Sequence, residues 1–450
     1  MSIFFATPNG LVPSSGRSAW INASIYDPSQ GLSGVRGGIL ISDGRIEAIG
    51  AEVHSENLGS DVEVRDLGGA VLIPGLIDMR CHISEPGGES RETIASASRA
   101  AAAGGITSVV MMPDTDPAMD DVALIDLALR TSRETAITRI LPSAATTRNF
   151  GGREMTEYGL MQAAGAVMLS QAGTTIMDAG VVRRSMTYAA DFDMLYGHVS
   201  HDPHLAGGGV MNESVLSTRL GLPGMPREAE LLPLERDLRL ARLSKVRYHA
   251  EKISTEMSES AVARAKDEGL AVSAGVTINH LLLTEDDIGE YRTFFKLAPP
   301  LRSDEDRIAL LSAVKSGTID VICSAHNPQG VDRKRLPFEE ATDGAIGLET
   351  LLAAGLELVH SDQLSLDDLV RAMANRPAKL LKLESGRLAP GANADFAVVD
   401  PDLKWTVNVG QLQSKSKNTC FEDREFRGRV IETVVGGRTV FSLHGNASAA

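Results

Sequence analysis

The stretch Ile73–Gly87, IPGLIDMRCHISEPG, is an apolar run that passes into charged and turn-forming residues. Side chains of a β-strand alternate between its two faces, so Arg80 and His82 share a face if the strand continues through them. Glu85-Pro86-Gly87 then predicts a turn. The stretch therefore predicts a buried strand that carries two polar side chains to one side of its carboxyl end.

Buried strands alternate with helices after this stretch. Apolar runs occur at Ile106–Met112, Ala166–Ser170 and Ile319–Ala325, and helical stretches such as TIASASRAAAAGG and SESAVARAKDEG lie among them. This alternation indicates a parallel sheet covered by helices. About 300 residues of such sequence predict a (β/α)8 TIM barrel, for which about 250 is typical. We assign residues 73–385 to this barrel.

Both ends of the chain instead contain short strands separated by turns. The segment Gly38–Ile49 alternates and contains Asp43-Gly44, which predicts a two-residue hairpin. The sequences ADFAVVDP, KWTVNV and RVIETVVGGRTVF have the same character near the other end. Because chain termini tend to lie close together, residues 1–72 and 386–450 are predicted to form one small β-sandwich domain. The tail 446–450 is expected to fray.

The bulk composition predicts a soluble cytoplasmic protein. A formal net charge of -15 and the lack of a basic run argue against nucleic acid or an anionic membrane as partner. Cys81, Cys323 and Cys420 are far apart and form no CxxC pair, which is typical of a reducing compartment. The start, MSIFFATPNGLVPSSG, lacks the features of a signal peptide, and no apolar run is long enough to cross a membrane.

The stretch Ile73–Gly87 resembles the first barrel strand of dihydroorotases and their relatives, usually written PGxxDxHxHxREPG. The resemblance continues in the family's order through AAAAGGITSVVMMPDTDP, GAVMLSQAG, LAGGGVMNES, KLAPPLRSDEDRIALL, IDVICSAHNPQG and GRLAPGANADFAVVDPD, from about residue 35 to 443. It implies a barrel of the amidohydrolase type. Dihydroorotases interconvert carbamoyl aspartate and dihydroorotate, with one or two divalent metals that polarise the amide and generate hydroxide.

Most positions that match the family's metal ligands carry side chains unsuited to bind a metal. The replaced positions are Arg80, Gln171, Val199, Lys252 and Ala325. Arginine has no lone pair to offer, and alanine can neither bind a metal nor act as the general base. His82 is retained, a shifted register would let His198 replace Val199, and His201 lies nearby. For His82, and for His249 and His280, hydrogen bonding within the protein is the favoured interpretation.

The positions that would contact the substrate have changed as well. The arginine expected to hold the substrate carboxylate is Ser84, two asparagine positions are Asp114 and Ala298, and a histidine position is Gln329. Simultaneous loss of metal ligands and substrate contacts predicts an inactive site without a metal cofactor.

Arg80 and Lys252 are expected to project into the mouth of the barrel. Local carboxylates, such as Asp114 or Glu85, would neutralise them in the favoured interpretation. The alternative is an anion-binding module, because two cations in a concave pocket attract phosphate or carboxylate.

The first functional hypothesis is a catalytically inactive protein with a structural or regulatory role in pyrimidine biosynthesis. Some bacteria have inactive dihydroorotase-like subunits that assemble with aspartate transcarbamoylase, and the resemblance implies this enzyme as partner. Because members of the family tend to form dimers, the resemblance also implies a homodimer. The competing hypothesis is a divergent cyclic-amide hydrolase with one zinc ion held by His82, by His198 or His201, and by Gln171.

Overall fold

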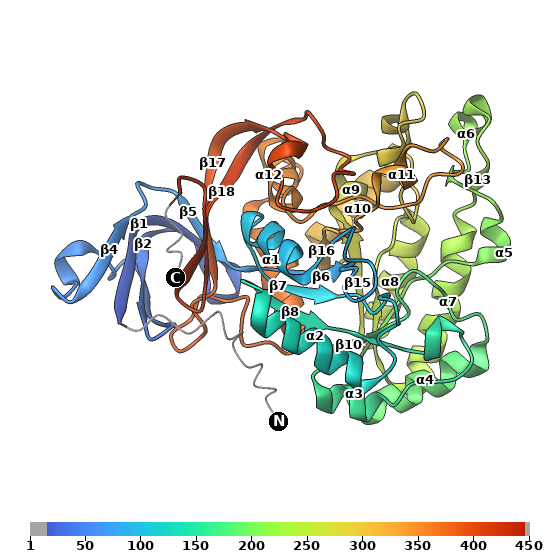
Figure 1. The fold of residues 1–450 in the computed structure, drawn as a ribbon, viewed down its shortest axis with the longest axis horizontal. Helices are drawn as coiled ribbons and strands as arrows, with labels where there is room; N and C mark the ends of the chain where they lie inside the picture. Colours follow the sequence, from blue (N-terminus) through green and yellow to red (C-terminus); the bar gives the residue numbers. More distant parts are fainter. Residues whose placement is uncertain (1–15, 446–450) are drawn as a thin grey trace.

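The computed structural model describes residues 16–445. The predictions of no signal peptide at the N-terminus and of a frayed tail at 446–450 fall outside the described residues, except that Gly16 is described. The ribbon in Figure 1 separates a β-sheet built from both ends of the chain, on the left, from a barrel of strands and helices on the right.

The two ends of the chain combine into one β domain, as predicted, and its strands belong to a single sheet. Its strands are β1 (Arg17–Asp27), β2 (Leu32–Ser42), β3 (Arg45–Gly50), β4 (Val62–Asp66), β5 (Val71–Pro74), β17 (Phe396–Thr406), β18 (Glu425–Val435) and β19 (Arg438–Ser442). They pair in the order β19-β18-β17-β5-β1-β2-β3, with β4 beside β1. Arg65 of β4 nevertheless donates a hydrogen bond to Thr439 of β19 (2.8 Å), so the sheet curls until distant strands meet.

Asp43 and Gly44 form the predicted two-residue hairpin between β2 and β3. Their φ angles are 49° and 74°, and Ser42 pairs with Arg45 across the turn. Two consecutive left-handed residues match the twist of the flanking strands, which explains the Asp-Gly sequence. The terminal sheet extends through Pro74 of β5, slightly beyond the predicted domain boundary at residue 72.

The barrel has eight parallel strands. They are β6 (Leu76–Cys81), β7 (Ile106–Met111), β8 (Arg139–Pro142) continued by β9 (Ala144–Ala145), β10 (Met168–Ser170), β11 (Leu195–His198), β14 (Arg247–Ala250), β15 (Val272–Thr277) and β16 (Val321–Cys323). A parallel bridge between Cys81 and His326 joins the last strand to the first. The Asp78 carboxylate accepts a hydrogen bond from the Ser324 backbone N–H (3.1 Å) at the same seam. The predicted (β/α)8 fold is therefore confirmed.

A helix follows each barrel strand. These helices are α1 (Ile94–Ala103), α2 (Val122–Thr135), α3 (Tyr158–Ala164), α4 (Ala179–Asp191), α7 (Glu228–Ser244), α8 (Glu256–Asp267), α10 (Asp304–Ser316) and α12 (Leu351–His360). Shorter elements are α5 (Pro203–Ala206), β12 (Met211–Asn212), α6 (Val215–Leu220), β13 (Gly224–Met225), α9 (Ile278–Leu282), α11 (Val331–Lys334), α13 (Leu366–Val370) and α14 (Arg376–Leu381). Among the described helices, none is both long and apolar enough for a membrane span.

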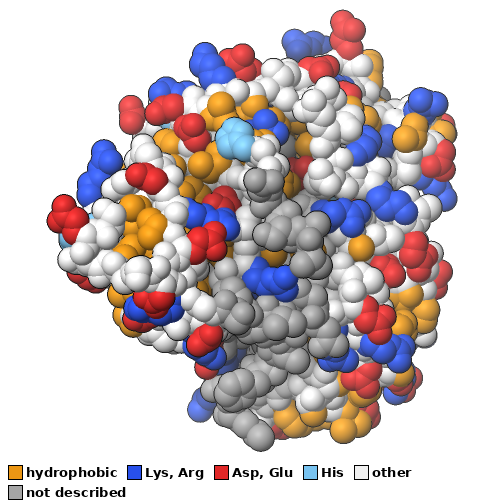
Figure 2. All heavy atoms as spheres, turned by 60° about the vertical axis from the view of Figure 1, so that its left-hand side comes forward, with side chains coloured by type: hydrophobic (Ala, Val, Ile, Leu, Met, Phe, Trp, Pro, Cys, Tyr) orange, Lys and Arg blue, Asp and Glu red, His pale blue; other side chains and the backbone are white. Residues whose placement is uncertain are grey.

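The terminal sheet passes into the barrel at Gly75, between β5 and β6. A Cβ at this glycine would lie 2.2 Å from Thr107 Oγ1, so only glycine fits. Nearby, Arg139 of β8 forms two hydrogen bonds of 3.1 Å with the buried Asp395 carboxylate. On the face shown in Figure 2, acidic and basic side chains are interspersed rather than gathered in one basic patch.

Candidate functional site

A cavity of about 460 Å³ opens at the carboxyl ends of the barrel strands, where TIM-barrel enzymes place their sites. It brings together ten of the residues singled out from the sequence: Arg80, His82, Asp114, Val199, His201, Lys252, His280, Ala298, Ala325 and Gln329. Five others lie outside its lining: Ser84, Glu85, Gln171, His198 and His249. The inward direction of Arg80 and Lys252 agrees with the sequence prediction.

Arg80 forms a buried ion pair with Glu251. Its Nη1 contacts Glu251 Oε2, and both side chains are only 2% exposed. Arg80 Nη2 also donates to the Ala172 carbonyl (2.9 Å), and Glu251 Oε1 accepts from the Ser170 hydroxyl (2.5 Å). The guanidinium therefore already has a full counter-charge inside the barrel.

The expected partners of Arg80 were wrong. Asp114 instead bonds to His82 (2.7 Å), and Glu85 accepts a hydrogen bond from the Ile94 backbone N–H (2.7 Å) at the start of α1. Sequence reasoning missed Glu251 because neighbouring strand residues point to opposite faces, and Lys252 was expected to face the interior. Strand β14 ends at Ala250, however, so the alternation does not extend to Glu251 and Lys252, and both side chains reach the interior.

His198 does not replace Val199 in the cavity. Its Nδ1 donates to Asp237 Oδ2 (2.5 Å), and its Nε2 accepts from the Ile176 backbone N–H (3.0 Å). Both ring nitrogens are thus engaged, and no lone pair is left for a metal. Val199 lines the cavity, so the shifted register that would have restored a ligand is wrong.

Gln171 is also unavailable as a ligand. Its Oε1 accepts hydrogen bonds from the backbone N–H and the hydroxyl of Thr147 (3.2 and 3.1 Å). Across residues 16–445, no group of three or more His, Cys, Asp or Glu side chains is arranged to hold a metal ion. The donor set does not fit the metal centre that the family resemblance implies.

Lys252 is a buried cation without a carboxylate partner. Its Nζ donates to the Ala298 carbonyl, and within the described chain it forms no ion pair. Burial, reinforced by the positive charge of Arg80, lowers the pKa of Lys252 to about 7. A large part of the lysine population is therefore neutral near physiological pH.

The retained histidines are held by hydrogen bonds. His82 donates from Nδ1 to Asp114, and burial lowers its pKa despite that carboxylate. His249 bonds to the Ser273 hydroxyl (2.9 Å), and burial lowers its pKa to about 3. His280 bonds to Thr277 (2.7 Å), with its pKa lowered to about 4. These contacts match the interpretation of hydrogen bonding within the protein.

The end of β16 separates Ala325 from His326. Ala325 has φ 49° and lines the cavity. His326 points elsewhere: its Nε2 lies 3.3 Å from Glu92 Oε2, and its Nδ1 accepts from the Gly347 backbone N–H (3.2 Å). The neighbouring histidine therefore does not replace the general base that Ala325 lacks.

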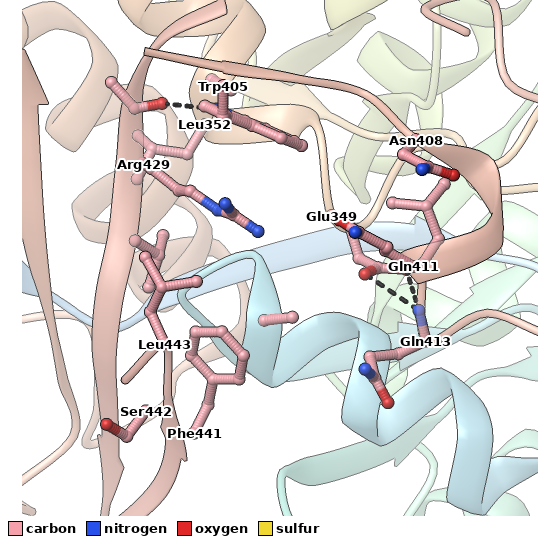
Figure 3. A pocket seen from close by; sticks show the side chains of 15 residues that line it. Glu349, Leu352, Trp405, Asn408, Gln411, Gln413, Arg429, Phe441, Ser442 and Leu443 are labelled. Atoms are coloured by element: carbon pink, nitrogen blue, oxygen red, sulfur yellow. Dashed lines mark hydrogen bonds between the residues drawn. The ribbon is translucent and has the colours of Figure 1, made fainter. Parts of the chain in front are cut away.

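A second cavity, of about 280 Å³, lies between the terminal sheet and the barrel (Figure 3). The Arg429 guanidinium lies 4.7 Å from the centroid of the Trp405 ring and points toward the space in front of Glu349. Glu349 accepts hydrogen bonds from the Gln413 backbone N–H (2.8 and 3.0 Å), and burial raises its pKa. This carboxylate thus fastens the segment after β17 to the barrel.

Comparison with known proteins agrees with the fold. The dihydro-orotase-like family matches residues 69–258, and an amidohydrolase family matches residues 341–441. The dihydroorotase of Anaeromyxobacter dehalogenans is 39% identical over 418 residues, covering 92% of this chain and 96% of that protein. The dihydroorotase of Syntrophus aciditrophicus is 39% identical over 417 residues, covering 93% and 97%.

Solved structures share the same architecture. The L-hydantoinase of Arthrobacter aurescens superposes with a TM-score of 0.84 at 24% identity, covering 95% of this chain and 96% of the other. A D-hydantoinase from a Thermus species gives a TM-score of 0.79 at 21% identity. The fold defines an amidohydrolase-type barrel. On the evidence of its relatives, the chain belongs to the dihydroorotase family.

Proposed function

We propose that this protein is a catalytically inactive dihydroorotase-like subunit. In this proposal it has a structural or regulatory role in pyrimidine biosynthesis, as a cytoplasmic partner of aspartate transcarbamoylase. The observation that carries the proposal is the Arg80–Glu251 ion pair, which places a paired guanidinium where the family resemblance implies a metal-binding histidine. A divalent ion there would be repelled by Arg80, and the Glu251 carboxylate is already paired with that guanidinium.

The other positions support the same conclusion. Hydrolysis of an unactivated amide needs a nucleophilic hydroxide and a group that takes up its proton. Ala325 offers no base, and Gln171 and His198 are engaged in hydrogen bonds outside the cavity. The barrel and the terminal sheet are nevertheless complete. A retained scaffold without catalytic groups is consistent with a function carried by the outer surface.

Metal content and activity test the first half of the proposal. Protein expressed with zinc and manganese and purified without chelator should contain fewer than about 0.1 metal ions per chain and should not hydrolyse dihydroorotate. An active dihydroorotase relative, prepared in the same way, is the positive control. About one ion per chain with measurable hydrolysis would instead support the one-metal alternative around His82 and His201.

Co-elution with aspartate transcarbamoylase tests the second half of the proposal, the partnership with that enzyme. The chain and the aspartate transcarbamoylase of the same organism should elute together from a size-exclusion column at physiological salt and micromolar concentration. The active relative, mixed with the same enzyme, controls for unspecific retention. Separate elution of this chain would contradict the proposed partnership even if the metal-free state holds. The mass of the chain alone would also test the expected homodimer.

A further inference from the structure

Two buried cationic side chains, Lys252 and Arg302, line the cavity. Lys252 forms no ion pair among the described residues, although only 9% of the residue is exposed. Arg302 is 3% exposed and lines the same cavity. Burial lowers the pKa of His201 and of His280, and the positive charges of Lys252 and Arg302 lower both further, so the two cations lie within electrostatic reach of the same two rings.

Arg302 has one free donor group. Its Nε donates to the Ser254 hydroxyl and its Nη1 to Asn212 Oδ1, each at 3.0 Å. Its Nη2 has no hydrogen-bond partner within residues 16–445, and the nearest carboxylate oxygen, on Glu230, is 3.8 Å away. That carboxylate already accepts two hydrogen bonds from Ser254. A buried guanidinium nitrogen without a hydrogen bond is costly, so a shift of Arg302 that turns Nη2 toward an acceptor in the cavity would be favourable.

The other charged residues of the cavity favour an anionic ligand near Lys252. Arg80 is neutralised by Glu251, and Asp114 is bonded to His82. Asp343 also lines the cavity, but it forms no ion pair with Lys252. Arg302 forms a buried ion pair with Glu230, 3.8 Å away. Of the two cations that the sequence offered for an anion, Arg80 and Lys252, only Lys252 is therefore without an ion pair among the described residues.

We propose that the cavity binds a small oxyanion, a carboxylate or phosphate group, between the Lys252 amine and Arg302 Nη2. The point charge of lysine and the one remaining guanidinium nitrogen of Arg302 are suited to such groups, because charged N–H donors form strong hydrogen bonds with anionic oxygens. A volume of about 460 Å³ accommodates a small metabolite. The site differs from the family's carboxylate contacts, whose positions here are Ser84, Asp114, Ala298 and Gln329. It does not depend on the proposed partner enzyme.

Isothermal titration of the full-length protein tests this site, with inorganic phosphate in one arm and malonate in the other, at fixed ionic strength. We expect one saturable site per chain with a Kd below about 1 mM for at least one of the two anions. Binding to phosphate alone would assign a phosphate ligand, and binding to malonate alone would assign a carboxylate.

Two variants locate the anion. Lys252→Met should weaken binding at least about tenfold, whereas Lys382→Met, which removes a surface cation paired with Asp193, should not change it. Lys252→Met removes an unpaired buried charge, so unfolding is not expected to explain the loss, and circular dichroism checks this. Arg302→Lys should also weaken binding, because the donor at the position of Nη2 is lost. The absence of saturable heat up to about 10 mM, or full affinity in Lys252→Met, would overturn the proposal.

Discussion

Removal of Arg80 is expected to destabilise the barrel more than removal of the whole ion pair. In Arg80→Met, the buried Glu251 carboxylate would keep only its hydrogen bond from Ser170. Loss of one partner of a buried ion pair costs about 3–5 kcal/mol, because the other charge is left without compensation. We therefore expect the free energy of unfolding of Arg80→Met to fall by about that amount.

The double variant Arg80→Met/Glu251→Leu provides the decisive comparison. Replacement of a buried ion pair by apolar residues of similar volume is often neutral or stabilising. The double variant should therefore lie within about 1 kcal/mol of the wild type, and the cycle should give a coupling energy of at least about 2 kcal/mol.

Urea unfolding followed by circular dichroism at 222 nm measures the transition of the barrel helices. Tryptophan fluorescence follows the terminal sheet separately, because Trp20 and Trp405 lie in β1 and β17. The fluorescence transition therefore shows whether the damage is confined to the barrel. A loss below about 1 kcal/mol in Arg80→Met, or a double variant no more stable than the single one, would refute the assignment of a buried, mutually dependent pair.

Three further changes test other parts of the structure. In the folded protein the pKa of Lys252 is about 7, below its ordinary value, so the unfolded chain binds one more proton above that pH. The free energy of unfolding should therefore rise by about 2 kcal/mol between about pH 7 and pH 9. Urea titrations of the wild type should show this rise, and Lys252→Met should lack it. Arg139→Met should lower stability by about 3 kcal/mol, measured by urea unfolding, because Asp395 stays buried without its cation; an unchanged midpoint would contradict this. Gly75→Ala should lower the melting temperature, since the new methyl group meets Thr107, and Thr107→Ala in the same chain should restore part of the loss.

Much of the fold was predictable because its signals are local. Apolar runs and helical stretches alternate along the chain, and Asp43-Gly44 matches the backbone of its turn. The curling of the terminal sheet was not predictable in the same way. It depends on contacts such as Arg65 with Thr439, which join segments from opposite ends of the chain.

The position of the candidate site was predictable, but the hydrogen-bond and ion-pair partners of its residues were not. Strand periodicity and the family resemblance directed Arg80 and Lys252 to the mouth of the barrel. The choice between His198 and Val199 stayed open, because a shift of one residue exchanges the two faces of a strand. The hydrogen bonds of His198 with Asp237 and Ile176 decide it.

The sequence by itself determined the class of fold and the absence of the expected chemical groups from the family's ligand positions, since an alanine or an arginine cannot bind a metal wherever it lies. Tertiary structure alone decided which charges compensate one another. Glu251 neutralises Arg80, whereas Lys252 stays unpaired and Arg302 keeps a free nitrogen. The reason is physical: periodicity acts between neighbours in the chain, but charge pairing depends on distances of a few ångströms between strands far apart in sequence.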